Sequence, residues 1–237
     1  YPINGQDQSL GLVVIDPGHG GKDSGAIGVK GLKEKDVCLQ LAISLAEELR
    51  RRNVKVALTR ESDVFVPLEQ RAALANQLGA DLFLSVHANA LEDQRVAGVE
   101  TYYLDMTDDR YALKLASVEN QIHEEKVSEI QFHLANLANQ LSTESSRELA
   151  GVIHRAAFRT MRWTVPGITK DLGVKSSLFY VLLGTRMPAV LLETGFITNP
   201  KQARALKSRQ YAKKLSREVA GGILAFLKQR EKEYLSE

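Results

Sequence analysis

The feature that most constrains the fold of this chain is an alternation between short apolar runs and longer segments with helical spacing. Leu12–Asp16 is an apolar run bounded by glycine, which is typical of a buried strand. Residues 34–52 then carry apolar side chains at the four-residue spacing of a helix. Strands that alternate with helices form βαβ units, in which helices cover both faces of a parallel sheet. The sequence therefore predicts an α/β fold with a mainly parallel, twisted sheet flanked by helices.

The same alternation continues to the end of the chain. Further strands are expected at residues 54–59, 81–87, 98–104, 179–183 and 189–193. Further helices are expected at residues 68–78, within 108–163, and at 199–207 and 209–235. A chain of 237 residues with 44% hydrophobic residues is long enough for one sizeable core, so a single domain is expected. There is no run of 18 apolar residues, so we expect no membrane span.

Charge is distributed unevenly along the chain. The net charge is +2, which is too small to indicate a nucleic-acid partner. Residues 105–148 contain nine Asp and Glu against four Lys and Arg, so this segment has a net charge of −5 and the remainder +7. The single cysteine, Cys38, excludes an intrachain disulfide, and its helical neighbours Val37 and Leu41 indicate a small buried side chain.

A glycine-rich loop, V-I-D-P-G-H-G-G-K-D-S-G from Val14 to Gly25, follows the first predicted strand. Such loops often bind phosphate, but the spacing here is wrong for that function. The dinucleotide pattern needs a glycine where Asp23 stands, and the Gly-Lys-Ser/Thr ending of the Walker pattern is missing. His19 lies at the centre of the loop, where glycines allow the backbone to approach a metal or substrate closely.

Four side chains that can bind or activate a metal lie at strand or helix ends. His19 follows the first strand, His87 ends another strand, Glu193 ends a third, and Glu34 begins a helix. Functional sites of parallel sheets gather at the carboxyl ends of the strands, so these groups are expected to converge. Two histidines and one glutamate are an accepted ligand set for catalytic zinc, and a fourth group would accept a proton from water. Taken alone, each histidine would more readily be explained as a surface or core residue, and it is the convergence of all four groups that favours a site.

Several motifs together resemble those of the zinc-dependent N-acetylmuramoyl-L-alanine amidases, which cleave bacterial peptidoglycan. They extend over nearly the whole chain, from about Leu12 to Phe226. The motifs are D-P-G-H-G-G (16–21), L-K-E-K-D (32–36), L-T-R-E-S-D (58–63), S-V-H-A-N-A (85–90), G-V-E-T-Y-Y-L (98–104), L-G-V-K (172–175) and L-L-E-T-G-F-I-T-N (191–199).

The resemblance implies a role for each of the four residues. His19, Glu34 and His87 would bind Zn²⁺, and Glu193 would be the catalytic carboxylate. The reaction implied is hydrolysis of the amide between N-acetylmuramic acid and L-alanine of the stem peptide. Zinc would acidify a water molecule and polarise the carbonyl, while Glu193 passes the proton to the departing amine. Asp23, Ser85 and Asn89 are candidates for orienting the imidazoles, and the sequence does not choose among them.

A segment of about forty residues, 106–145, separates the G-V-E-T-Y-Y-L strand from the next helix, where minimal members of the family have little between the two. It resembles the inserted helix of the division amidases of Gram-negative bacteria, which blocks the active site until a LytM-domain partner displaces it. The resemblance therefore also implies autoinhibition, a role in daughter-cell separation and a periplasmic location.

Helical spacing places two apolar stripes in this segment. One stripe consists of Tyr111, Leu115, Val118 and Ile122, and the other of Val127, Ile130, Leu134, Leu137 and Leu141. Both stripes are expected to pack on the core. At about 100° per residue, Glu119 lies beside the first stripe, so it is the candidate for an inhibitory fourth zinc ligand. Glu125 is the second candidate. The other histidines (His123, His133 and His154) lack ligand spacing and are expected to be structural or exposed.

These observations predict a catalytic domain at residues 10–230, preceded by a linker at residues 1–9, and a monomer. Tyr1 does not begin a signal-peptide pattern, so a mature or trimmed form is expected. Two alternatives remain open. The same metal chemistry could cleave a bond within the stem peptide, or the chain could be a non-catalytic wall-binding module that holds zinc structurally.

Overall fold

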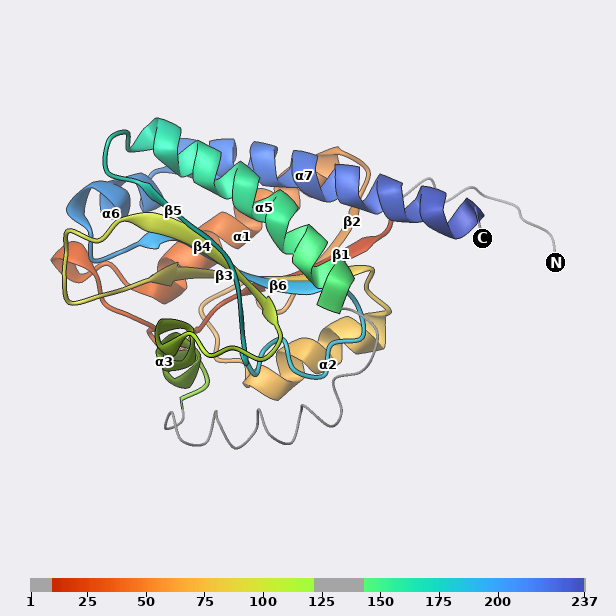
Figure 1. The fold of residues 1–237 in the computed structure, drawn as a ribbon, viewed down its shortest axis with the longest axis horizontal. Coiled ribbons are helices and arrows are strands. Elements are labelled where there is room, and N and C mark those ends of the chain that lie inside the picture. Colours follow the sequence, from red (N-terminus) through yellow and green to blue (C-terminus); the bar gives the residue numbers. More distant parts are fainter. Residues whose placement is uncertain (1–9, 122–142, 237) are drawn as a thin grey trace.

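The computed structural model describes residues 10–121 and 143–236, and the side chains of 10–121 and 143–233. Its centre is a six-stranded sheet with the order β2-β1-β3-β6-β4-β5. Four of the five strand pairings are parallel, and β4 pairs antiparallel with β6. Figure 1 shows α1, α5 and α7 on one face of the sheet and α2 and α3 on the other. The predicted single α/β domain with a mainly parallel sheet is confirmed.

Strands and helices alternate along most of the chain. The strands are β1 (Leu12–Pro17), β2 (Lys55–Leu58), β3 (Leu82–Asn89), β4 (Gly98–Leu104), β5 (Lys170–Ser177) and β6 (Ala189–Phe196). The helices are η1 (Val29–Gly31), α1 (Glu34–Arg51), α2 (Leu68–Leu78), α3 (Arg110–Glu119), α5 (Thr143–Thr164), α6 (Pro200–Leu206) and α7 (Arg209–Ser236). None of the helices in the described part of the chain is long and apolar enough to cross a bilayer.

Hydrophobic packing differs between the two faces of the sheet. The larger core lies under α1, α5 and α7 and contains Val13, Leu84 and Leu192 from the central strands. The smaller core lies under α2 and α3 and contains Val14 and Phe83. Every residue of β3 and β6 is buried, which is why these central strands are nearly continuous apolar runs.

One predicted strand was wrong, and one strand was missed. Residues 179–183 form a turn, although their apolar sequence F-Y-V-L-L favoured a strand. Phe179 and Leu182 are buried in the smaller core, so burial accounts for their apolar character. The strand lies earlier, at β5, whose sequence K-D-L-G-V-K-S-S is mostly polar because β5 is an edge strand with partly exposed side chains.

Helix α3 lies within the predicted inserted segment, but it buries a different face from the one expected. Its buried residues are Ala112, Ala116 and Ser117. Leu115 packs partly against the smaller core, whereas Val118 is 62% exposed. Small side chains therefore allow α3 to lie close to the sheet, and the expected contact of Val118 was wrong. Ile122, the whole second stripe and the linker at residues 1–9 lie outside the described residues.

Candidate metal and catalytic site

The candidate site lies at one edge of the sheet, on the face that α3 covers. β1, β3 and β6 run in the same direction, so their carboxyl ends lie together. His87 on β3 is paired with Glu193 on β6, and Glu193 is in turn paired with Glu100 on the antiparallel strand β4. Residues paired across neighbouring strands point to the same face. The strand register therefore brings one histidine and two glutamates to a single surface.

His19 lies in the loop that follows β1, in an unusual backbone conformation. Its φ angle is +59°, in the left-handed region that few residues other than glycine adopt. The glycines of the loop make room for the site. A Cβ at Gly18 would lie 2.4 Å from the His87 ring, and one at Gly25 would lie 2.6 Å from the His19 ring and 2.7 Å from Glu34 Oε2. The backbone therefore approaches the site closely at Gly18 and at Gly25, as the sequence predicted.

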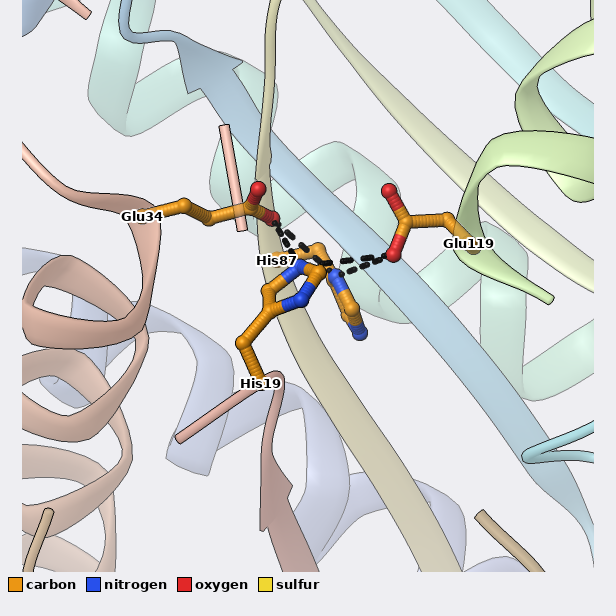
Figure 2. A group of neighbouring side chains, drawn as sticks. All are labelled: His19, Glu34, His87 and Glu119. Atoms are coloured by element: carbon orange, nitrogen blue, oxygen red, sulfur yellow. Dashed lines mark hydrogen bonds and ion pairs between the residues drawn. The ribbon is translucent and has the colours of Figure 1, made fainter. Parts of the chain in front are cut away.

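Two imidazoles and two carboxylates converge at this edge (Figure 2). Their candidate ligand atoms, one each from His19, Glu34, His87 and Glu119, all lie within 4.8 Å of one another. Glu34 Oε1 is 3.1 Å from both His19 Nε2 and His87 Nδ1. Glu119 Oε2 is 3.4 Å from His19 Nε2 and 3.2 Å from His87 Nδ1. Glu34 comes from the first turn of α1, and Glu119 from the last turn of α3.

The donor atoms of this cluster fit a divalent cation. His19 Nε2 is buried and forms no hydrogen bond with any described residue, despite its short distances to two carboxylates. Burial disfavours the charged form of His19, but Glu34 and Asp23 outweigh it and raise the pKa of His19 to about 10. Burial would likewise lower the pKa of His87. Glu119 and Glu34 outweigh this effect and raise the pKa of His87 well above its usual value. The carboxylates thus favour positive charge at the point where a metal would bind.

Glu193 lies beside this cluster without belonging to it. Its side chain is 1% exposed, and neither carboxyl oxygen has a hydrogen-bond partner among the described residues. Burial raises the pKa of Glu193 well above its usual value, and the neighbouring Glu34, Glu119 and Glu100 add to this shift while His87 opposes it. A buried carboxyl group with high proton affinity beside a candidate metal site is the arrangement expected of a general base.

Of the three candidates for orienting the imidazoles, only Asp23 contacts one. Asp23 Oδ2 is 3.0 Å from His19 Nδ1, which turns His19 Nε2 toward the cluster. Ser85 instead donates to Asp16 Oδ2 at 2.7 Å. Asn89 donates to the hydroxyl oxygen of Tyr111 at 2.8 Å. The sequence could not make this choice because all three residues lie within four positions of a histidine.

Two buried arginines that hold the His19 loop were missed from the sequence. Arg60 donates to the carbonyl oxygens of Pro17 and Gly18 at 3.1 and 2.7 Å. Arg71 donates to the carbonyl of His19 at 2.9 Å and to Asp16 Oδ1, also at 2.9 Å. The sequence signal for Arg60 was its place inside the L-T-R-E-S-D motif, because a buried arginine has to be hydrogen-bonded.

A second polar network surrounds Glu100, directly across from Glu193. Glu100 Oε2 accepts hydrogen bonds from Tyr102 and Asn89, at 2.5 and 3.4 Å. Lys175 Nζ lies 3.5 Å from Glu100 Oε1 and 4.8 Å from the centre of the Tyr111 ring. Glu100 is therefore well supplied with donors, whereas Glu193 has none among the described residues.

The C-terminal end of α3 is held against the body of the protein. Asn120 is buried, donates to the Leu178 carbonyl at 2.7 Å and accepts from the Tyr180 amide at 2.7 Å. Gln121, which has a φ angle of +57°, donates to Asp23 Oδ2 at 3.2 Å. These contacts fix the helix end that carries Glu119 over the cluster.

Two cavities open on this cluster. Their volumes are about 360 and 320 Å³, and both are lined in part by His19, Asp23, Glu119 and Gln121. The end of α3 therefore forms a wall common to both.

The remaining candidates divide into two groups. Glu125, His123 and His133 lie outside the described residues. His154 is buried in α5, 3.2 Å from Thr101 Oγ1 and 2.7 Å from Asp171 Oδ1, which links α5 to β4 and β5. Its expected structural role is consistent with these contacts.

Comparison with known proteins adds an independent observation. Residues 13–225 match the family model described as N-acetylmuramoyl-L-alanine amidase (Amidase_3). The chain is 32% identical over 224 residues to the N-acetylmuramoyl-L-alanine amidase AmiA of Escherichia coli, covering 91% of this chain and 75% of AmiA. It is 34% identical over 217 residues to the N-acetylmuramoyl-L-alanine amidase LytC of Bacillus subtilis, of which it covers 35%.

Solved structures show the same fold. The amidase AmiC2 of Nostoc punctiforme superposes with a TM-score of 0.67 at 34% identity, covering 93% of this chain and 98% of the other. The catalytic domain of the amidase CwlV of Bacillus (Paenibacillus) polymyxa var. colistinus gives a TM-score of 0.68 at 31% identity, covering 92% and 98%.

Proposed function

Because this chain belongs to the N-acetylmuramoyl-L-alanine amidase family and is an enzyme of that class, we propose that it is a zinc-dependent, autoinhibited form of that enzyme. His19, Glu34 and His87 would hold the metal. The observation that carries this proposal is the convergence of the buried His87 ring and the buried Glu34 carboxylate on His19 Nε2, a buried atom that has no hydrogen-bond partner among the described residues. Nitrogen and carboxylate donors of this kind suit Zn²⁺.

The protein's own residues divide the catalytic work. A zinc ion bound here would supply a Lewis acid that polarises the scissile carbonyl and acidifies water. Asp23 keeps His19 Nε2 directed into the site, and Glu34 is held by the Ala26 and Ala88 amides at 2.9 and 3.1 Å. Glu193 accepts the proton of the attacking water and transfers it to the departing amine of L-alanine.

Glu119 would act as the inhibitory carboxylate. Its Oε2 atom approaches both imidazoles and would occupy the position that a substrate carbonyl or water must take. Asn120 and Gln121 hold the helix end in that place. We assign the enzyme to the periplasm and to daughter-cell separation, with a LytM-domain protein as activator and a monomer as the working form, because segment 106–145 resembles the inhibitory insert of the division amidases.

The test is hydrolysis of purified peptidoglycan by zinc-loaded variants. Glu119→Ala should raise basal hydrolysis at least about tenfold, because it removes a bias of about 1.4 kcal/mol or more toward the blocked state. Arg110→Ala, which removes a charge from the exposed N-terminal end of the same helix and lines neither cavity, is the matched control and should leave activity unchanged. Unchanged activity of Glu119→Ala with zinc retained would contradict autoinhibition.

The catalytic role of Glu193 is tested in the same assay. Glu193→Gln should keep its zinc and lose hydrolysis, whereas loss of zinc would indicate a closed structural site.

Mass analysis of the products identifies the bond that the enzyme cleaves. Muramyl sugars without peptide, together with intact stem peptides, are expected, and shortened stem peptides would indicate a peptidase instead.

A further inference from the structure

A basic groove lies between α5 and α7, on the face of the sheet opposite the candidate metal site. Figure 1 shows the two helices side by side there, with α3 across the sheet. The groove is a cleft of about 410 Å³ whose charged lining consists of Arg52, Arg155, Arg159, Arg217 and Glu218. Nothing in the catalytic proposal uses it, and it belongs to the part of the chain that carries the excess positive charge.

Three of the four arginines have no ion-pair partner among the described residues. Arg52 pairs with Glu48 at 2.6 Å and donates to the backbone carbonyl of Arg217 at 3.2 Å. The guanidinium groups of Arg155, Arg159 and Arg217 form no salt bridge or hydrogen bond with any residue in the described part of the chain. Like charges gathered around one cleft repel each other, and an anion bound between them would relieve this repulsion.

The shape of the groove depends on two glycines of α7. A Cβ at Gly222 would lie 2.7 Å from Cγ1 of Val152 on α5, so the helices approach closely at this point. Gly221 lines the cleft beneath the guanidinium of Arg52, 3.6 Å from the position of a Cβ. The uncharged part of the lining consists of these two glycines with Val152 and Ala156, and the arginine side chains surround it. Guanidinium groups in such a lining match carboxylates through paired hydrogen bonds.

An exposed tryptophan extends the groove along α5. Trp163 is 74% exposed and lies one helical turn beyond Arg159, with Lys214 Nζ of α7 5.4 Å from its ring centre. Its flat apolar ring can pack against a sugar. Trp163 is also the only large apolar side chain that is exposed on the described parts of α5 and α7. A face that binds a lipid bilayer typically carries several apolar side chains, so this one favours a saccharide polymer with anionic groups.

We propose that this basic groove binds the free carboxylates of peptidoglycan stem peptides, at a second and non-catalytic site. Because the groove and the candidate metal site lie on opposite faces, the groove would hold a different strand from the one being cleaved. The enzyme would then stay attached to the insoluble wall between cleavage events.

Co-sedimentation of the metal-free protein with purified sacculi measures this binding independently of zinc and of catalysis. The charge reversals Arg155→Glu, Arg159→Glu and Arg217→Glu, made together, should weaken binding at least about tenfold, as expected for the loss of charged hydrogen bonds. The corresponding triple lysine variant keeps the charge but loses the paired geometry, so it should show a smaller loss. Hydrolysis of a small soluble muropeptide should be the same in all these variants.

A second basic cleft provides the matched control. It lies between η1, α1 and α6, and its lining includes Lys30, Arg204 and Lys207. Reversing these three charges changes the net charge by the same amount and should leave binding nearly intact. An equal loss in this control would show that overall charge is responsible and would overturn the proposal.

The ligand is identified with two further probes. Sacculi whose carboxylates have been converted to amides should bind weakly, and vesicles of phosphatidylglycerol and phosphatidylcholine should not bind. Unchanged binding to amidated sacculi, or binding to vesicles alone, would contradict the proposal. Thermal melting confirms that each variant is folded. If charge reversal unfolds the protein, the lysine variant decides the question, and wild-type affinity in that variant would count against the groove.

Discussion

At the scale of single residues, the site depends on buried charges that hold the His19 loop in a strained shape. Asp16 is fully buried and accepts hydrogen bonds from Thr59, Arg71 and Ser85. Burial alone would raise the pKa of Asp16, but Arg71 and the hydroxyl donors outweigh it, so the pKa lies below its ordinary value of 3.8. Arg71 also binds the carbonyl of His19, which connects this ion pair directly to the candidate metal site.

Asp16→Asn should therefore destabilise the protein by about 2–4 kcal/mol at neutral pH, because it leaves the buried Arg71 without its carboxylate. A depressed pKa means that the ionised form stabilises the folded state above the unfolded pKa, and that this stability is lost as pH falls. The difference in free energy of unfolding between wild type and variant should be constant above about pH 5 and shrink below about pH 4. Urea unfolding across this range measures it, and a difference that persists at low pH would contradict the assignment.

At the scale of elements, two adjacent glycines in α7 differ in the space that a side chain would have. Gly222 is required by the close approach of Val152, whereas Gly221 has room for a methyl group. Glycine in a helix interior costs about 1 kcal/mol relative to alanine. Only at Gly222 does helix packing provide a reason for that cost.

Gly221→Ala should stabilise the protein by about 0.5–1 kcal/mol, since it gains helix propensity without a clash. Gly222→Ala should destabilise it by about 1 kcal/mol or more, because the added methyl forces α5 and α7 apart. Denaturant unfolding of the two single variants makes a direct comparison. Equal effects at both positions would show that α5 and α7 are not in close contact at Gly222.

At the scale of the whole molecule, the candidate metal site joins parts of the chain that are far apart in sequence. His19 and Glu34 come from the N-terminal part, His87 from the middle of the sheet, and Glu119 from the end of α3. A metal bound to all four would stabilise the folded state as a whole, because the unfolded chain cannot bring these ligands together.

Adding zinc to metal-free protein should therefore raise the melting temperature. The free energy of unfolding should increase by about 2.7 kcal/mol at a zinc concentration a hundredfold above the dissociation constant. Glu34→Gln should lose most of this effect, and Glu193→Gln should keep it, since Glu193 lies outside the cluster of candidate ligands. Differential scanning calorimetry with and without a chelator measures the shift. No change on adding zinc would contradict a metal site at this edge.

The sequence by itself determined the fold class, most element positions and the residues that would meet at the sheet edge. These follow from local spacing, since apolar periodicity specifies strands and helices, and parallel strands place their carboxyl ends together. It failed at residues 179–183, where burial rather than regular structure explained an apolar run, and at Val118, which helical spacing placed toward the core but which is 62% exposed.

Only the tertiary structure decided which partner each polar group has. It assigned Asp23 to His19, Arg71 to Asp16 and Asn120 to the turn at Leu178. It also placed Glu119 against both imidazoles and gathered the arginines of α5 and α7 into one groove. Spacing along the chain constrains the direction of a side chain, but hydrogen bonds and ion pairs depend on distances of a few ångströms between distant segments, which only packing sets.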